Sequence, residues 1–189
     1  MNSRRALLGT ASLLGVSLAL PRIARAQLLD RPGTVIALRH AIAPGTGDPA
    51  SFVIGDCATQ RNLDAAGRQQ AAAIGEALRA GGLGGAPVYS SRWCRCLETA
   101  ELLALGPVTP LPALDSFFSE RQRRQAQTEA LRAFLAREGA DGPALVLVTH
   151  QVNISALAGR GTRSGEAVVL ERLPDGGLEV VGSLPPPAI

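Results

Sequence analysis

TVIALRH, at residues 34–40, is an apolar run that ends in one of only two histidines in the chain. The second histidine ends a similar run, ALVLVTH, at residues 144–150. Short runs of β-branched and leucine residues are typical of buried strands in a parallel or mixed sheet. Ligand and catalytic sites of α/β folds lie at the carboxyl ends of such strands. The two runs therefore predict an α/β fold with His40 and His150 at one edge of its sheet, and simple strand capping is the alternative role.

The rest of the chain alternates between strand-like and helix-like patterns. We expect helices over residues 64–80, 95–105, 122–137 and 153–158, extended segments over 87–90 and 108–114, and a long loop over 41–59. A hairpin is expected at the end, with strands at 168–172 and 178–181 around the turn PDGG at 174–177. The apolar stripes of the two long helices should be Ala71, Ile74, Ala77 and Leu78, and Ala126, Ala130, Leu131 and Phe134. This order predicts a three-layer α/β/α sandwich on a mixed, mostly parallel sheet in a single domain at residues 34–189.

Between the histidines lies VYSSRWCRCLETA, at residues 88–100, in which a short strand ends in two serines before a helix that carries Arg95. With Arg39-His40, the segment NLDAAGRQQA at 62–71 and the late strand that ends in His150, it resembles the phosphoglycerate mutase-like branch of the histidine phosphatase superfamily. The motifs follow one another in the family's order from about Thr34 to Ala156. The resemblance implies a phosphatase with the same three-layer fold.

A phosphoryl group in transfer spreads negative charge over three oxygens, so its site needs several fixed donors. Guanidinium groups suit this purpose because they are planar and stay charged. The resemblance implies that Arg39 and Arg95 bind the phosphate, that His40 is the nucleophile, and that His150, protonated in the field of the phosphate, is a further donor. Ser90 or Ser91 is a possible hydroxyl donor, with capping of the next helix as the alternative.

The acid that would protonate the leaving group is less well defined. The segment LDSFFSE at residues 114–120 stands where the mutase-like branch has its acidic donor. Asp115 has the better offset and Glu120 the more usual side chain, so both stay candidates. The alternative is a structural role for each residue: Asp115 would cap a helix, and Glu120 would stand at the start of one. The acid phosphatase branch is disfavoured because Gln151 follows the second histidine, where that branch has aspartate.

The first 26 residues have the features of an export signal: two arginines, an apolar stretch at residues 6–20, and Ala-Arg-Ala before Gln27. The paired arginines favour the twin-arginine route, a Sec signal and an uncleaved anchor being the alternatives. Residues 27–33 would be a tether. Removal of the signal leaves 15 arginines against 16 acidic residues, a net charge of −1. The mature chain therefore gives no argument for binding nucleic acid or inserting into a membrane, and we expect it in the periplasm or otherwise exported.

Three cysteines occur in the chain, at positions 57, 94 and 96. In an oxidising compartment one pair should form a disulfide, and Cys57 bonded to Cys94 or Cys96 would join two segments of the site. Their spacing fits no familiar zinc site. No metal or organic cofactor is implied, because the arginines supply the positive charge.

The chain resembles an exported subgroup that includes lipopolysaccharide core heptose phosphatase-like proteins. The resemblance rests on the expected export and on the segments at residues 56–63, 93–96 and 149–154. The expected substrate is therefore a small sugar phosphate or another envelope phosphate. A phosphate-binding protein without turnover is the alternative, which a carboxylate beside His40 would argue against. The arginines at 121, 123 and 124 are expected to be a solvated helix start, with attraction of an anionic substrate as the other interpretation. The sequence leaves the oligomeric state open.

Overall fold

In the computed structural model, which describes residues 29–188, six strands form one mixed sheet. The strands are β1 (Thr34–Arg39), β2 (Val88–Ser90), β3 (Val108–Pro110), β4 (Leu145–Thr149), β5 (Ala167–Arg172) and β6 (Leu178–Leu184). Their order is β3-β2-β4-β1-β5-β6, with the first four parallel and the last two antiparallel to their neighbours. The expected export signal lies outside the described residues.

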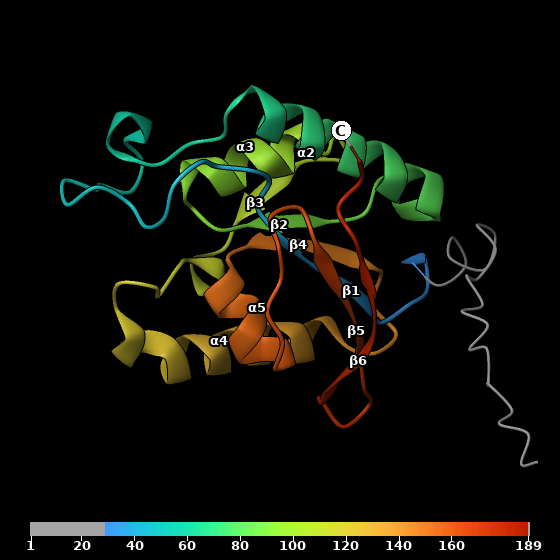
Figure 1. Ribbon diagram of the computed structural model, residues 1–189. Coiled ribbons are helices and arrows are strands. Elements are labelled where there is room, and N and C mark those ends of the chain that lie inside the picture. Colours follow the sequence, from blue (N-terminus) through green and yellow to red (C-terminus); the bar gives the residue numbers. More distant parts are fainter. Residues whose placement is uncertain (1–28, 189) are drawn as a thin grey trace, which may run out of the picture.

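Helices cover both faces of this sheet, which gives the three-layer α/β/α sandwich that the sequence predicts (Figure 1). On one face lie α2 (Ala65–Leu78) and α3 (Cys94–Leu102), and on the other lie α4 (Arg124–Glu138) and α5 (Gln151–Ala158). Short helical turns complete the set: η1 (Cys57–Thr59), η2 (Arg79–Leu83), η3 (Pro112–Leu114) and η4 (Arg121–Arg123). None of the helices within residues 29–188 has the length and apolar character needed to span a membrane.

The alternation of side chains along β1 and β4 builds a core on each side of the sheet. Ile36, Leu38, Val146 and Val148 pack with α2 and α3, whereas Val35, Ala37, Leu145 and Leu147 pack with α4 and α5. Successive residues of a strand point to opposite faces, so strands covered on both sides are apolar throughout. The apolar runs that end in His40 and His150 are thus the two central strands of the fold.

The apolar stripes expected on the two long helices are confirmed only in part. Ala77, Ala126 and Ala130 are exposed rather than in the core. In α4 the buried residues are Gln127, Leu131 and Leu135. Gln127 can be buried because its side-chain amide donates to the carbonyl oxygens of Asp115 and Ala113. The segment 108–114 is extended only to Pro110 and then turns into η3. Packing also begins before the expected domain start, since Leu29 is buried in the α2-side core.

Candidate active site

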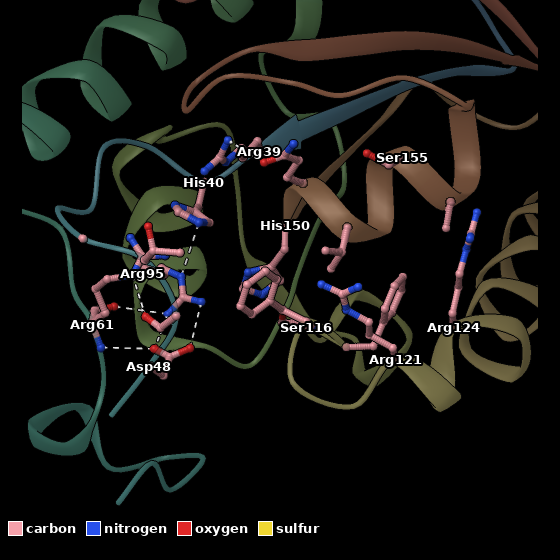
Figure 2. Close-up of a pocket in the computed structure, with 18 residues that line it drawn as sticks. Arg39, His40, Asp48, Arg61, Arg95, Ser116, Arg121, Arg124, His150 and Ser155 are labelled. Atoms are coloured by element: carbon pink, nitrogen blue, oxygen red, sulfur yellow. Dashed lines mark hydrogen bonds and ion pairs between the residues drawn. The ribbon is translucent and has the colours of Figure 1, made fainter. Parts of the chain in front are cut away.

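The register of β1 and β4 brings the two histidines together. These parallel strands are neighbours with Arg39 opposite Thr149, so the residue that follows each strand lies at the same sheet edge. The rings of His40 and His150 have their centroids 5.5 Å apart, and both side chains are buried. They line a cavity of about 610 Å³ together with Arg39, Arg61, Arg95 and Asp48 (Figure 2).

Two contacts fix the protonation of His40. Its Nδ1 lies 2.8 Å from the carbonyl oxygen of Ala41, which can only accept, so Nδ1 carries the hydrogen. Its Nε2 accepts from Arg95 Nε at 3.3 Å. Burial, followed by the positive charge of Arg95, lowers the pKa of His40 to about 3. The ring is therefore neutral near pH 7, with the Nε2 lone pair facing the cavity beside a guanidinium.

Arg95 is held by a carboxylate that the sequence analysis does not single out. Asp48 accepts from Arg95 Nη1 at 2.6 Å and from Nη2 at 3.1 Å, and also from the Trp93 indole and the Arg61 backbone. Hydrogen bonds and the charge of Arg95 outweigh burial and lower the pKa of Asp48. The guanidinium thus meets Asp48 with its two terminal nitrogens, and its Nε side faces His40.

Arg39 and Arg61 add positive charge to the same end of the cavity. Arg39 Nη1 donates to Thr162 O at 2.8 Å and to Gln151 Oε1, while its buried Nε has no hydrogen-bond partner in the described part of the chain. Arg61 donates to the carbonyl oxygens of Ala43 and Gly47 and so holds the loop after β1. Burial, then the charge of Arg95, lowers the pKa of both guanidinium groups.

His150 is enclosed at the amino end of α5. Its Nε2 lies 2.9 Å from Ser91 Oγ and 3.4 Å from Cys96 Sγ, which leaves Nδ1 as the nitrogen available to a ligand. Burial and then the neighbouring His40 and Arg95 lower the pKa of His150 well below its usual range. The protonated His150 that we expect from the resemblance therefore requires a bound anion, whose negative charge opposes these effects.

The remaining site candidates lie outside the cavity lining. Ser90 is fully buried, and its hydroxyl donates to the Ser91 carbonyl. Asp115 is also buried and accepts from the backbone and guanidinium of Arg92. Glu120 is exposed and forms an ion pair with Arg123. The structure thus brings Arg39, His40, Arg95 and His150 together. Asp115 is linked to His150 only through the Ser91 hydroxyl, and Glu120 is on the surface.

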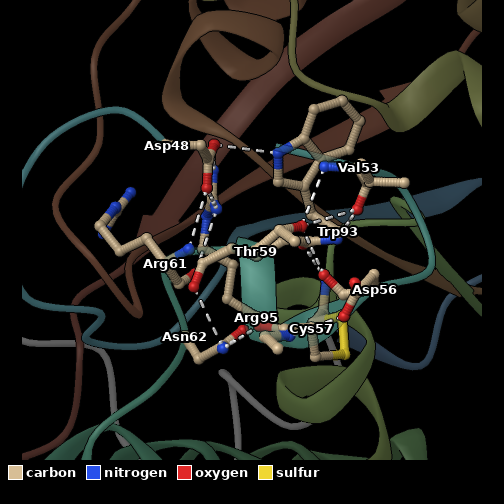
Figure 3. The surroundings of a disulfide bond; sticks show 12 residues. Asp48, Val53, Asp56, Cys57, Thr59, Arg61, Asn62, Trp93 and Arg95 are labelled. Carbon is tan, nitrogen blue, oxygen red and sulfur yellow. Dashed lines mark hydrogen bonds and ion pairs between the residues drawn. A yellow bond between two sulfur atoms is a disulfide. The ribbon is translucent and has the colours of Figure 1, made fainter. Parts of the chain in front are cut away.

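A disulfide ties the loop after β1 to α3 (Figure 3). It joins Cys57 to Cys94, one of the two pairings left open by the sequence, and the third thiol, Cys96, is buried. Burial raises the pKa of Cys96 to about 12, so this thiol is not a nucleophile near neutral pH. Phe52 of the loop also stacks on Trp93, at a centroid distance of 4.8 Å. These contacts fix the segment that carries Asp48.

Within residues 29–188, no three histidine, cysteine or acidic side chains are grouped as metal ligands would be. The polar groups of the cavity are instead dominated by guanidinium and imidazole, which suit an anion. A neutral histidine with a free ring nitrogen beside fixed guanidinium donors is an arrangement that can accept a phosphoryl group.

Comparison with known proteins agrees with this geometry. A model of the histidine phosphatase superfamily (branch 1) matches residues 53–119, the part of the chain between the two histidines. None of the curated proteins matches.

Solved structures show the same fold. The protein histidine phosphatase SixA complexed with tungstate is 18% identical, with a TM-score of 0.58, over 81% of this chain and 97% of that one. A SixA from Nakamurella, described as a putative phosphohistidine phosphatase, is 22% identical, with a TM-score of 0.59, over 84% and 98%. A mycobacterial glucosyl-3-phosphoglycerate phosphatase is 17% identical, with a TM-score of 0.56, over 80% and 98%. The more specific resemblance to lipopolysaccharide core heptose phosphatases finds no support in these matches. In part of its sequence, in its fold and in its paired histidines, the chain is thus similar to the histidine phosphatase superfamily.

Proposed function

We propose that the chain is an exported phosphomonoesterase that acts through a phosphohistidine on His40. The observation that carries the proposal is the tautomer of this residue, since Ala41 takes the Nδ1 hydrogen and leaves the Nε2 lone pair beside Arg95. A neutral ring with a free lone pair is what attack on phosphorus requires. Arg39, which lines the same cavity, adds a positive charge that supports an anion there.

Two displacements complete the reaction. In the first, His40 Nε2 bonds to phosphorus, the bond from phosphorus to the ester oxygen breaks, and the leaving alkoxide takes a proton from solvent water. In the second, water attacks phosphorus and gives up a proton to solvent, the N–P bond breaks, and His40 regains its lone pair. Arg39 and Arg95 neutralise the charge on the phosphoryl oxygens in both steps. His150, protonated once phosphate is bound, is the donor that we propose at the opposite side.

The position of the acids affects which esters react fast. Asp115 and Glu120 lie off the cavity, and Asp48, a carboxylate that does line it, is in an ion pair with Arg95. We therefore expect esters with good leaving groups, such as aryl or anomeric sugar phosphates, to react faster than simple alkyl phosphates. For an exported protein, sugar phosphates of the cell envelope fit this preference. The same observation favours the second candidate function, a phosphate-binding protein without turnover.

Rapid quenching into alkaline detergent, in which a phosphohistidine is stable, tests these two functions. The chain from Gln27 onward would be mixed with 4-nitrophenyl phosphate at pH 4 to 8, beside His40→Asn and His40→Ala, with folding checked by circular dichroism. We expect turnover and an acid-labile phosphoryl-enzyme in the wild type, and a loss of more than about 10³-fold in both variants. Turnover that survives in both variants contradicts the assignment of His40. Phosphate binding without turnover in the wild type favours the binding protein.

A further inference from the structure

The cavity has a second positively charged end. Figure 2 shows Arg39, His40, Arg61 and Arg95 on one side, and Arg121 and Arg124 on the other side beyond His150 and Ser116. The volume of about 610 Å³ lies within the usual range for whole small-molecule ligands, roughly 300–1,000 Å³, and leaves room beyond a phosphoryl group. A substrate can therefore reach from His40 toward the far arginines.

The charges at the reactive end already match a phosphate. Arg39, Arg61 and Arg95, offset by Asp48, give a formal charge of +2, and a phosphomonoester carries up to about two negative charges near pH 7. Arg121 and Arg124 add two more positive charges to the cavity lining, where the described residues supply no further acid. This excess is not needed for the scissile phosphate.

The two far arginines also differ from the arginine between them. Arg123 forms an ion pair with Glu120 and does not line the cavity. Neither Arg121 nor Arg124 has a side-chain hydrogen bond or ion pair in the described part of the chain, and both are exposed. Their spacing of three residues, at η4 and the start of α4, puts them on the same side of the helical turn. A purely solvated helix start would not explain why the unpaired members are those that face the cavity.

The cavity lining also includes apolar side chains. Phe117, Phe118, Val152 and Ala156 are among them, and Ser116 and Ser155 are neutral polar groups of the same lining. We propose that Arg121 and Arg124 form an outer subsite for a second anionic group, a carboxylate or a phosphate, on the leaving group of the substrate. This inference rests on the proposed function and specifies its substrate class: phosphomonoesters with an anion at the far end of the leaving group.

Matched substrates test the subsite. Phenyl phosphate would be compared with 4-carboxyphenyl phosphate, and butyl phosphate with butane-1,4-diol bisphosphate, in the wild type, in Arg121→Gln/Arg124→Gln and in the control Arg123→Gln. We expect the wild type to favour the doubly anionic member of at least one pair by about 5- to 30-fold in kcat/KM at low ionic strength, and less at high salt. The double variant should bring this ratio close to one, and Arg123→Gln should leave it unchanged. The pair that shows the preference distinguishes a carboxylate from a phosphate.

Calorimetric binding of the same ligands to His40→Asn separates this inference from the proposed function. If the wild type hydrolyses none of the esters but binding still favours the doubly anionic ligands through Arg121 and Arg124, catalysis fails and the subsite stands. Equal kcat/KM values within each pair, or a preference that persists in the double variant, would overturn the subsite while leaving the phosphatase in place.

Discussion

Arg95 contacts two groups through different sides of its guanidinium. Its terminal nitrogens donate to Asp48, and its Nε donates to His40 Nε2. A phosphoryl group that approaches His40, the proposed nucleophile, would meet the Nε side of Arg95, which is already turned toward that ring. The geometry therefore makes Asp48 a positioning residue, because it holds Arg95 in the orientation that phosphate needs.

Replacing Asp48 by Asn tests this role. The amide keeps one acceptor but loses the charge and turns a donor toward Arg95. We expect kcat/KM for an aryl phosphate to fall by about 10- to 100-fold, the cost of a misplaced catalytic group, and inorganic phosphate to bind more weakly. Competitive inhibition by phosphate gives the second value. Asp56→Asn, in the same loop but bonded to Ala58, is the control. Tighter phosphate binding in Asp48→Asn would mean that Asp48 competes with the substrate for Arg95, contrary to the positioning role.

The sequence identifies the site residues that stand next to a recognisable element. His40 and Arg39 end one strand, His150 ends another, and Arg95 follows the paired serines. The sequence does not point to Asp48, because this residue lies in a loop rich in Gly and Pro that has no periodic pattern. Its partner, Arg95, is 47 residues away in the chain. Arg61 precedes a recognised motif and could have been singled out there.

The sequence leaves the choice of acid open for a related reason. The sequence offers two carboxylates at a plausible offset, but it does not show that Arg92 engages the first one.

At the scale of elements, α2 and α3 hold the backbone that follows His40. The Ile42 amide donates to Gln70 Oε1 at 3.0 Å, and the Ala41 amide donates to Thr99 Oγ1 at 3.1 Å. Gly67, at the start of α2, lies so close to this backbone that an added Cβ would be 2.0 Å from the Ile42 carbonyl oxygen. Gly67 and Gln70 of the motif at 62–71 thus let α2 pack closely against the backbone that follows His40.

Gly67→Ala should therefore affect both stability and activity. Alanine favours a helix by up to about 1 kcal/mol over glycine, but the contact with a backbone oxygen forces α2 and the loop apart. We expect a net loss of about 1–3 kcal/mol in unfolding free energy, with a lower kcat. Urea unfolding and steady-state kinetics measure the two effects. Gly84→Ala is the control, because a Cβ there meets nothing within 4 Å. Wild-type stability and activity in Gly67→Ala would show that the loop adapts freely.

The boundaries of the elements follow from local signals, but their buried faces are less certain from sequence. Asp64, where the sequence predicts that this helix begins, caps α2 by accepting from the Gly67 amide. The hydrophobic pattern places the alanines at 77, 126 and 130 in the core, but they are exposed, because a small apolar side chain fits either face of a helix. Gln127 is buried through its side-chain hydrogen bonds, which a hydrophobic pattern cannot reveal.

At the scale of the whole molecule, the fold holds its two histidines buried and neutral at the point where the central strands end. Both pKa values lie below the ordinary value of 6.5, first because of burial. The unfolded chain, in contrast, protonates these rings as the pH falls through about 6.5. Between that pH and the lowered folded values, the unfolded state binds more protons than the folded state. The folded state therefore loses stability as the pH falls in this range.

We expect the unfolding free energy of the chain from Gln27 onward to fall between pH 7 and pH 4.5. The slope should approach about 1.4 kcal/mol per pH unit for each histidine that stays neutral. Urea unfolding in buffers free of phosphate and sulfate measures it. His40→Asn should show a shallower slope, because one of the chain's two histidines is then absent. Tungstate or inorganic phosphate should flatten the slope in the wild type, since a bound anion favours the protonated form of His150. An unfolding free energy that is constant from pH 7 to pH 4.5 without these anions would mean that the rings accept protons in the folded state, and the assignment of a neutral nucleophile would lose its basis.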